Sequence, residues 1–84
     1  MSPADGLSPV VTLYGRAECC LCDEALARLR PLASELGFTI RERDITADDE
    51  LHRAYLERIP VVCVGEQEVC ELELDEAALR RALA

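Results

Sequence analysis

Three cysteines lie within four positions in the stretch ECCLCD, which begins at Glu18. Thiols at this density can shuttle electrons, hold a metal ion or fill a core. Cys19 and Cys22 have C-x-x-C spacing, which brings two sulfurs within bonding reach on one helical turn. A thiolate at Cys19 can attack a disulfide and form a mixed disulfide, which Cys22 then resolves. The spacing therefore favours a redox pair with Cys19 as the nucleophile and Cys22 as the resolving thiol.

Metal binding is the second chemistry that the cysteine cluster allows. Cys19, Cys20 and Cys22 could hold Zn²⁺, Cu⁺ or an iron–sulfur cluster if a partner or a second chain supplied a further ligand. The sequence has no second C-x-x-C and no Cys–His pair nearby, and its one histidine, His52, falls on a polar stretch. We therefore assign no metal ligands, although the metal alternative stays open.

Length and charge limit the class of protein. The chain has 84 residues, of which half are hydrophobic, enough for one compact core. We expect a single domain at residues 9–84 and a flexible tail at residues 1–8. The net charge of −8 argues against nucleic acid and membrane surfaces as partners, because phosphate-rich surfaces bind basic patches. The N-terminal stretch has no basic segment and no long apolar run, and the five cysteines are an odd number, so we expect a cytoplasmic protein.

The elements on either side of the cluster must position the thiols. Residues 10–14 are apolar and β-branched, which predicts a buried strand. At residues 20–36 apolar side chains recur every three or four positions, which predicts an amphipathic helix that Gly37 ends. Cys19 then lies at the helix N-terminus, whose unpaired N–H groups and partial positive charge favour a thiolate.

The second half of the chain predicts three more strands and two more helices. Residues 38–44 alternate in polarity, as an edge strand does. Thr46, followed by acidic residues, resembles an N-cap that opens a short helix to about Leu56. The remaining predicted elements are a hairpin with arms at 61–64 and 68–72, and a final helix that Asp75 caps.

Cys63 and Cys70 fall on the two arms of the predicted hairpin. Depending on the register, they could be cross-strand neighbours. Residues of this kind are more often small buried hydrophobes, and we favour that interpretation over a structural disulfide.

Two arginines could lie beside the thiolate. Arg16 stands three residues before Cys19, and Arg58 stands two residues before Pro60. If the loop that carries Pro60 lies beside the helix start, both guanidinium groups flank Cys19 and attract anionic groups. The alternative for each is a solvated surface arginine.

The stretch VTLYGRAECCLCDEAL, followed by RIPVV and a short hairpin, resembles the glutaredoxin family of the thioredoxin superfamily. It is most similar to the small glutaredoxin-like proteins with the motif LY-x4-C-x-L-C, and the resemblance extends from Val10 to about Leu83. It implies an α/β, thioredoxin-like (glutaredoxin) fold. The expected sheet has four strands in the order 2-1-3-4, two parallel and then two antiparallel, with three flanking helices.

The resemblance also implies roles for individual residues. Cys19 and Cys22 match the redox pair, and Ile59-Pro60 matches the cis-proline loop, where the backbone of Ile59 would pair with a substrate strand. Arg16 matches the basic residue that helps to hold a glutathione carboxylate. The residues expected to bind substrate are Arg16, Cys20, Leu21, Arg58, Ile59 and Pro60. Cys20 and Leu21 stand where glutaredoxins often have Pro-Tyr.

One departure from the family bears on the substrate. Glutathione-binding members carry Gly-Gly and then Asp where this chain has residues 69–73, which include Glu71 and Glu73. We therefore expect a disulfide-containing protein or a small thiol as substrate, and a reductase or glutathione as electron donor. We expect no cofactor and a monomer. A redox-inactive thioredoxin-like interaction module stays as the third alternative.

Overall fold

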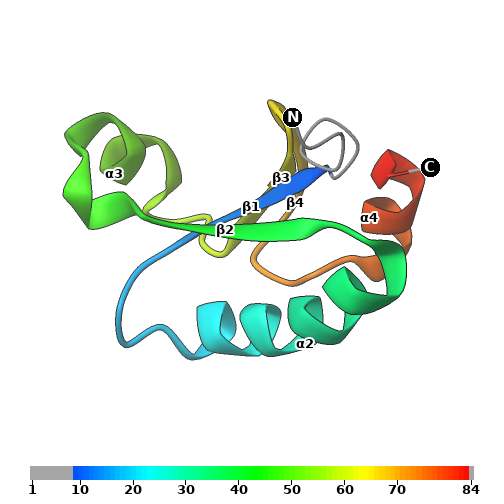
Figure 1. Ribbon diagram of the computed structural model, residues 1–84. Helices are drawn as coiled ribbons and strands as arrows, with labels where there is room; N and C mark the ends of the chain where they lie inside the picture. Colours follow the sequence, from blue (N-terminus) through cyan, green and yellow to red (C-terminus); the bar gives the residue numbers. More distant parts are fainter. Residues whose placement is uncertain (1–8, 84) are drawn as a thin grey trace, which may run out of the picture.

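The computed structural model describes residues 9–83, so the predicted tail at residues 1–8 lies outside the described residues. Figure 1 shows how the elements follow one another in space. They are, in chain order, β1 (Val10–Gly15), α2 (Cys20–Leu36), β2 (Thr39–Asp44), the 3₁₀ turn η1 (Ile45–Ala47), α3 (Asp49–Tyr55), β3 (Val61–Val64), β4 (Gln67–Glu71) and α4 (Glu76–Leu83).

The four strands form one mixed sheet in the order β2-β1-β3-β4. β1 runs parallel to β2 and antiparallel to β3, and β3 runs antiparallel to β4. The predicted strand order and the α/β, thioredoxin-like class are therefore confirmed. β1 and β3 are the two inner strands, and the polar strand β2 lies at an edge, as its alternating sequence predicted.

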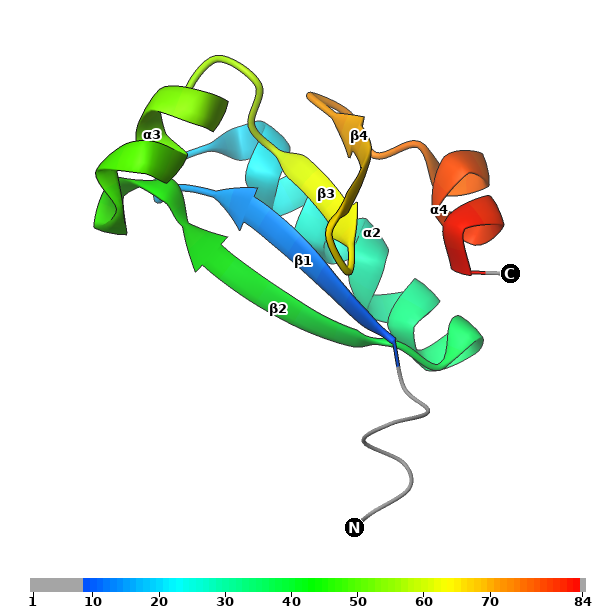
Figure 2. The ribbon, with the colours of Figure 1, turned by 90° about the horizontal axis from the view of Figure 1, so that it is seen from above.

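The main core lies between the sheet and the helices α2 and α4. Leu13 and Val62 from the inner strands pack there against Leu29 of α2 and Leu79 of α4. Figure 2 shows α2 crossing behind β1 and β3, while α3 lies on the other face. Burying a leucine or valine side chain stabilises a fold by roughly 1.5–3 kcal/mol, so these contacts hold α2 firmly on the sheet.

The helix that carries the cysteines has well-defined ends. Cys19 is the N-cap residue, with extended backbone angles (φ −110°, ψ 108°). Gly37 ends the helix in the left-handed region at φ 77°, and its N–H donates to Ala33 O at 2.9 Å. Glycine reaches this conformation without the clash that a β-carbon causes, which is why it ends so many helices.

The predicted N-cap of α3 was wrong. Asp44 Oδ1 accepts hydrogen bonds from the Thr46 N–H at 2.8 Å and from the Thr46 hydroxyl at 2.6 Å. Thr46 therefore belongs to η1, and its hydroxyl acts as a donor to Asp44. The residue that caps α3 is Asp48, which accepts from the N–H of Glu50 at 2.8 Å. The run of acidic residues offered two aspartate caps where the sequence analysis expected one threonine cap.

The hairpin cysteines do not face each other. Cys70 pairs with Val62 across the ladder and Cys63 with Glu68, with an irregularity between them. Cys63 is buried, Cys70 packs against the core under α2 and α4, and both thiols are free. This burial agrees with the interpretation of both residues as small hydrophobic side chains. Within residues 9–83, no helix is long and apolar enough to cross a membrane.

Candidate functional site

Cys19 sits between the end of β1 and the first turn of α2. Its Sγ accepts a hydrogen bond from the backbone N–H of Cys22 at 3.2 Å. Its carbonyl accepts from the Asp23 N–H at 3.0 Å, which closes the first helical turn. Cys19 is half-buried, and its sulfur lies against an N–H group at the positive end of the helix.

Cys22 is the buried member of the pair, with 6% of its surface exposed. Burial raises the pKa of its thiol to about 11. The hydrogen bond to Cys19 and the charge of Asp23 act in the same direction, while a backbone hydrogen bond from Arg16 opposes them. Cys22 therefore stays a protonated thiol at neutral pH. A half-buried Cys19 in front of a buried, protonated Cys22 is the arrangement that a nucleophile and a resolving thiol require.

Gly15 allows β1 to approach the first turn of α2. A β-carbon built on Gly15 would lie 2.9 Å from Cys22 Sγ and 3.2 Å from Cys22 Cβ. Any side chain there would push the helix start away from the strand. The sequence analysis missed this requirement, because the contact depends on how closely α2 sits on the sheet.

The Ile59–Pro60 loop lies beside the cysteine pair, as the resemblance implied. Ile59 and Cys22 belong to one buried cluster, on which the half-buried Cys19 also packs. The Ile59–Pro60 peptide bond is cis, and both residues are buried. Among the backbone hydrogen bonds of the described residues, none outside the regular elements uses the N–H or C=O of Ile59.

Arg58 lies against β4. Its guanidinium donates to Glu68 at 2.7 Å and to Glu71, with Nε–Oε1 at 3.2 Å, and it stacks over the Tyr55 ring with Cζ 5.3 Å from the centroid. These carboxylates raise the pKa of Arg58 further. The sequence analysis placed the charge of Arg58 beside Cys19. In the structure Glu68 and Glu71 balance that charge.

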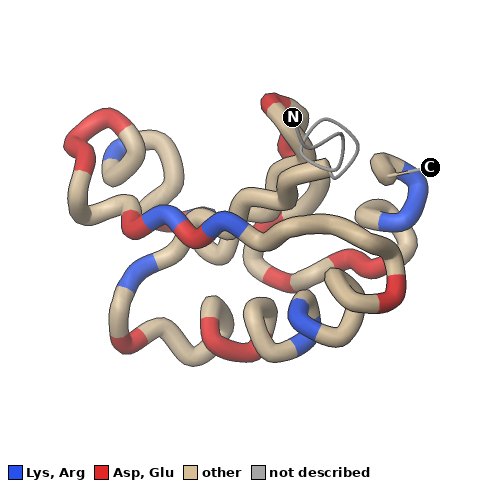
Figure 3. The backbone as a smooth tube through the Cα atoms, viewed as in Figure 1, with Lys and Arg blue, Asp and Glu red and all other residues tan. Residues whose placement is uncertain are grey.

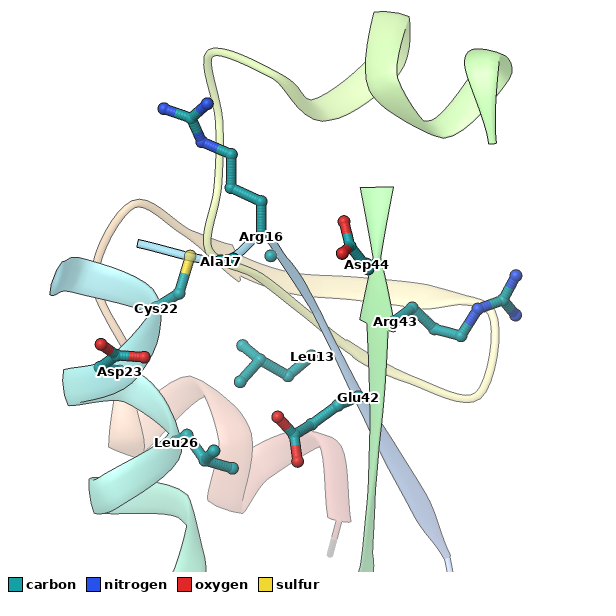
Figure 4. Close-up of a pocket in the computed structure, with 10 residues that line it drawn as sticks. Leu13, Arg16, Ala17, Cys22, Asp23, Leu26, Glu42, Arg43 and Asp44 are labelled. Atoms are coloured by element: carbon teal, nitrogen blue, oxygen red, sulfur yellow. The ribbon is translucent and has the colours of Figure 1, made fainter. Parts of the chain in front are cut away.

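Arg16 is exposed and forms no ion pair with any residue in the range 9–83. It lines a cavity of about 320 Å³ between α2 and the ends of β1 and β2, together with Gly15, Cys22, Glu42 and six other residues. In Figure 4 the Cys22 sulfur points toward the Arg16–Ala17 segment, and Glu42 reaches from β2 toward Leu26 of α2. Arg16 is therefore the arginine near the pair whose charge is available to a ligand.

Cys20 and Leu21 are both exposed at the start of α2. Leu21 borders a small hollow of about 50 Å³ whose other side is the segment after β4, Leu72 to Leu74. The N–H of Leu72 donates to Pro60 O at 2.9 Å and to Arg58 O at 3.1 Å, so this segment lies directly beside the Ile59–Pro60 loop. The sequence analysis did not single out Leu72 as a site residue.

The described residues do not assemble a metal site. No group of three or more Cys, His, Asp or Glu side chains among residues 9–83 is arranged to hold a metal ion. Cys20 is exposed while Cys22 is buried, so the thiols of the cluster do not converge on one point.

The fold and the position of the C-x-x-C pair define a protein of the thioredoxin superfamily. The chain belongs to the glutaredoxin-like proteins: the family model described as "Glutaredoxin-like domain (DUF836)" matches residues 10–84. The predicted resemblance to small glutaredoxin-like proteins is therefore confirmed.

Three curated proteins and one solved structure are similar to this chain over most of its length. Uncharacterized proteins of Mycobacterium bovis and of two strains of Mycobacterium tuberculosis are each 35% identical over 81 residues, which is 90% of this chain and 84% of the relative. The solution NMR structure of protein Ne2328 from Nitrosomonas europaea has a TM-score of 0.83 and 30% identity, and the match covers 92% of this chain and 93% of that one. These similarities extend along nearly the whole domain.

Proposed function

We propose that this protein is a thiol-disulfide oxidoreductase in which Cys19 is the nucleophile and Cys22 the resolving thiol. One observation carries the proposal. Cys19 is half-buried at the N-terminus of α2, and its Sγ accepts the Cys22 N–H at 3.2 Å, while Cys22 is buried. This asymmetry gives the first sulfur access to a substrate and keeps the second protonated until it is needed.

The reaction would proceed in two balanced steps. The Cys19 thiolate attacks one sulfur of a substrate disulfide, which breaks the substrate S–S bond and releases one substrate thiolate. Cys22 then loses its proton to solvent and attacks Cys19 Sγ, which releases the second substrate thiolate. The protein ends as a Cys19–Cys22 disulfide and the substrate gains two electrons.

The surroundings of the pair support a substrate site. The unused backbone groups of Ile59, beside Pro60, could pair with an extended substrate segment. Arg16 could attract a carboxylate, and the exposed Cys20 and Leu21 could contact the substrate next to its disulfide. Arg58 would act less directly, because Glu68 and Glu71 hold its guanidinium.

The remaining parts of the proposal concern partners and location. A disulfide-containing protein or a small disulfide would be the substrate, and an external reductase or glutathione would restore the dithiol. The odd number of cysteines and the free thiols suit a reducing, cytoplasmic setting, and the protein would act as a monomer. The protein would need no cofactor of its own, because the electrons reside in the thiols.

Single-turnover reduction of hydroxyethyl disulfide by the reduced protein tests the proposal. Cys19→Ser should abolish the reaction, and Cys22→Ser should trap a mixed disulfide on Cys19 that mass spectrometry detects. Cys70→Ser, which changes a thiol away from the pair, is the matched control and should react like the unmodified protein. Full activity in Cys19→Ser would refute the assignment.

A further inference from the structure

We infer that the surface beside the thiol pair takes an extended segment of a protein disulfide whose flanks carry apolar and basic side chains, an inference that rests on the proposed function. This docking surface consists of Leu21 and Glu24 on α2, and Leu72 and Glu73 on the segment between β4 and α4. These four residues line the same hollow. The surface therefore joins two elements that are about 50 positions apart in the sequence.

The apolar part of the docking surface consists of two exposed leucines. Leu21 and Leu72 are 44% and 45% exposed, and the other exposed large hydrophobic residues in the range 9–83 are Val10 and Leu56. Leu21 lies one residue before the buried resolving thiol and two residues after Cys19. An apolar side chain next to a substrate disulfide can bury these two leucines when its sulfur reaches Cys19.

The backbone holds Leu72 in place. Its φ is 67°, a left-handed value that bulky residues rarely adopt. The Glu73 N–H donates to Glu71 O at 2.7 Å, which makes Leu72 the centre of a tight three-residue turn. The Leu72 N–H is fixed at the same time by Pro60 O and Arg58 O. A strained position that displays an apolar side chain beside a reactive group is a common sign of a functional role.

The charged part of the surface selects the partner. Glu24 and Glu73 form no ion pair with any described residue. Figure 3 shows acidic residues along the first turns of α2 and along the segment between β4 and α4. Arg28, the cation of the same hollow, donates to Leu74 O at 3.4 Å. Two carboxylates against one guanidinium leave the surface with a net negative charge, which complements Lys and Arg side chains on a partner.

The same charge argues against two other occupants. Glutathione is anionic and would meet Glu24 and Glu73 with like charge. A second copy of this chain carries the same net charge of −8 and would be repelled as well. A basic protein segment satisfies the apolar and the charged parts together, and its backbone could pair with the unused groups of Ile59.

The test uses the full, reduced chain with a matched pair of disulfide-linked peptides. Both peptides have leucine next to the cysteine, and they differ by lysines or glutamates at the flanking positions. We expect the lysine peptide to be reduced about tenfold faster at low salt, and we expect this ratio to fall toward one as salt is added. Quenched samples are alkylated and the peptide thiols are counted by mass spectrometry.

Two charge-reversal variants test whether the preference for lysine peptides comes from the docking surface. Glu73→Arg should lower the ratio of lysine-peptide to glutamate-peptide rates several-fold. Glu66→Arg, on the exposed hairpin turn, changes the net charge equally and should leave the ratio as it is. An unchanged ratio in Glu73→Arg, or glutathione disulfide reacting faster than the lysine peptide, would overturn the inference. So would a dimer that Leu72→Ser abolishes, since the occupant would then be a second copy.

Hydroxyethyl disulfide separates this inference from the proposed function. It is small and uncharged, so its reduction reports the thiol pair alone. Reduction of hydroxyethyl disulfide without any peptide preference would refute the docking inference and leave the oxidoreductase proposal standing. If no disulfide is reduced at all, the proposed function fails and the inference fails with it.

Discussion

A β-carbon on Gly15 would lie 2.9 Å from Cys22 Sγ, closer than real β-carbons come to other atoms. The strand end and the first helical turn are therefore packed with no space for a side chain. Gly15 fixes the distance between the sheet and the Cys22 thiol, and so the depth at which Cys22 is buried.

Replacing Gly15 with alanine should disturb both stability and the thiol pair. We expect Gly15→Ala to lower the free energy of unfolding by about 1–3 kcal/mol, as overpacking does, and to expose Cys22 to alkylation. Urea denaturation and iodoacetamide labelling measure the two effects.

Gly65→Ala is the control, because at φ 61° it has open space around it and no contact with Cys22. It should cost about 1 kcal/mol from backbone strain without changing the labelling of Cys22. Equal labelling of Cys22 in both variants would contradict the packing argument.

The raised pKa of Cys22 predicts a loss of stability at high pH. An ordinary thiol has a pKa of 9.0 here, and burial raises that of Cys22 to about 11 in the folded protein. The neutral thiol thus favours folding below about pH 9. This contribution is lost as the pH rises through 11, because the unfolded chain releases the proton earlier.

Urea midpoints of the reduced protein between pH 7 and 11 measure this loss. Cys22→Ala should be less stable at pH 7 and should lose less stability above pH 9. Burial also raises the pKa of Cys63 and Cys70, and both contribute to the loss of stability at high pH. The difference in urea midpoint between the unmodified protein and Cys22→Ala therefore reports Cys22 alone. Parallel curves for the two proteins would show that Cys22 titrates as it does in the unfolded chain.

Most of the fold was predictable because hydrophobic pattern and chain connectivity determine it. The apolar strand around Val11, the helix that Gly37 ends and the polar edge strand each have a strong local signal. A strand–helix–strand unit makes the first two strands parallel, and the hairpin adds the last two. The boundary at Thr46 failed because two aspartates cap successive turns, Asp44 accepting from the Thr46 N–H and Asp48 from the Glu50 N–H. Sequence preferences for N-cap residues do not decide which residue begins the helix when several candidates lie two to four positions apart.

The candidate site was predictable where sequence spacing or the family resemblance points to a residue. Cys19 and Cys22 follow from C-x-x-C spacing, and the Ile59–Pro60 loop from family resemblance. Gly15 and Leu72 matter through contacts across the fold, with Cys22 Sγ and with Pro60 O respectively. For Arg58 the sequence spacing was misleading. It placed the guanidinium near Cys19, whereas Glu68 and Glu71 are its partners in the structure.

The Arg58 ion pairs should be worth little for stability. Arg58 and Glu68 are 34% and 43% exposed, and exposed pairs of this kind contribute up to about 1 kcal/mol. A double-mutant cycle with Arg58→Gln and Glu68→Gln should give a coupling energy of about 0.5 kcal/mol at low salt and less at high salt. The Arg80–Glu76 pair, which lies four residues apart on α4, provides a comparison of about 0.3–0.5 kcal/mol. A coupling above about 2 kcal/mol would mean that the Arg58 pair is shielded from solvent.

At position 72, a glycine variant should be more stable than an alanine variant, which is the reverse of the usual order. At most positions glycine is less stable than alanine by about 0.5–1 kcal/mol, because it gains more freedom on unfolding. At φ 67° a β-carbon costs about 1–2 kcal/mol, and glycine avoids that cost. We therefore expect Leu72→Gly to be more stable than Leu72→Ala by about 0.5–1 kcal/mol in urea denaturation. Both variants remove the exposed side chain, so both should reduce lysine peptides more slowly while their stabilities differ. If Leu72→Ala proved the more stable, the backbone at this turn would be relaxed, and the docking surface would not depend on strain.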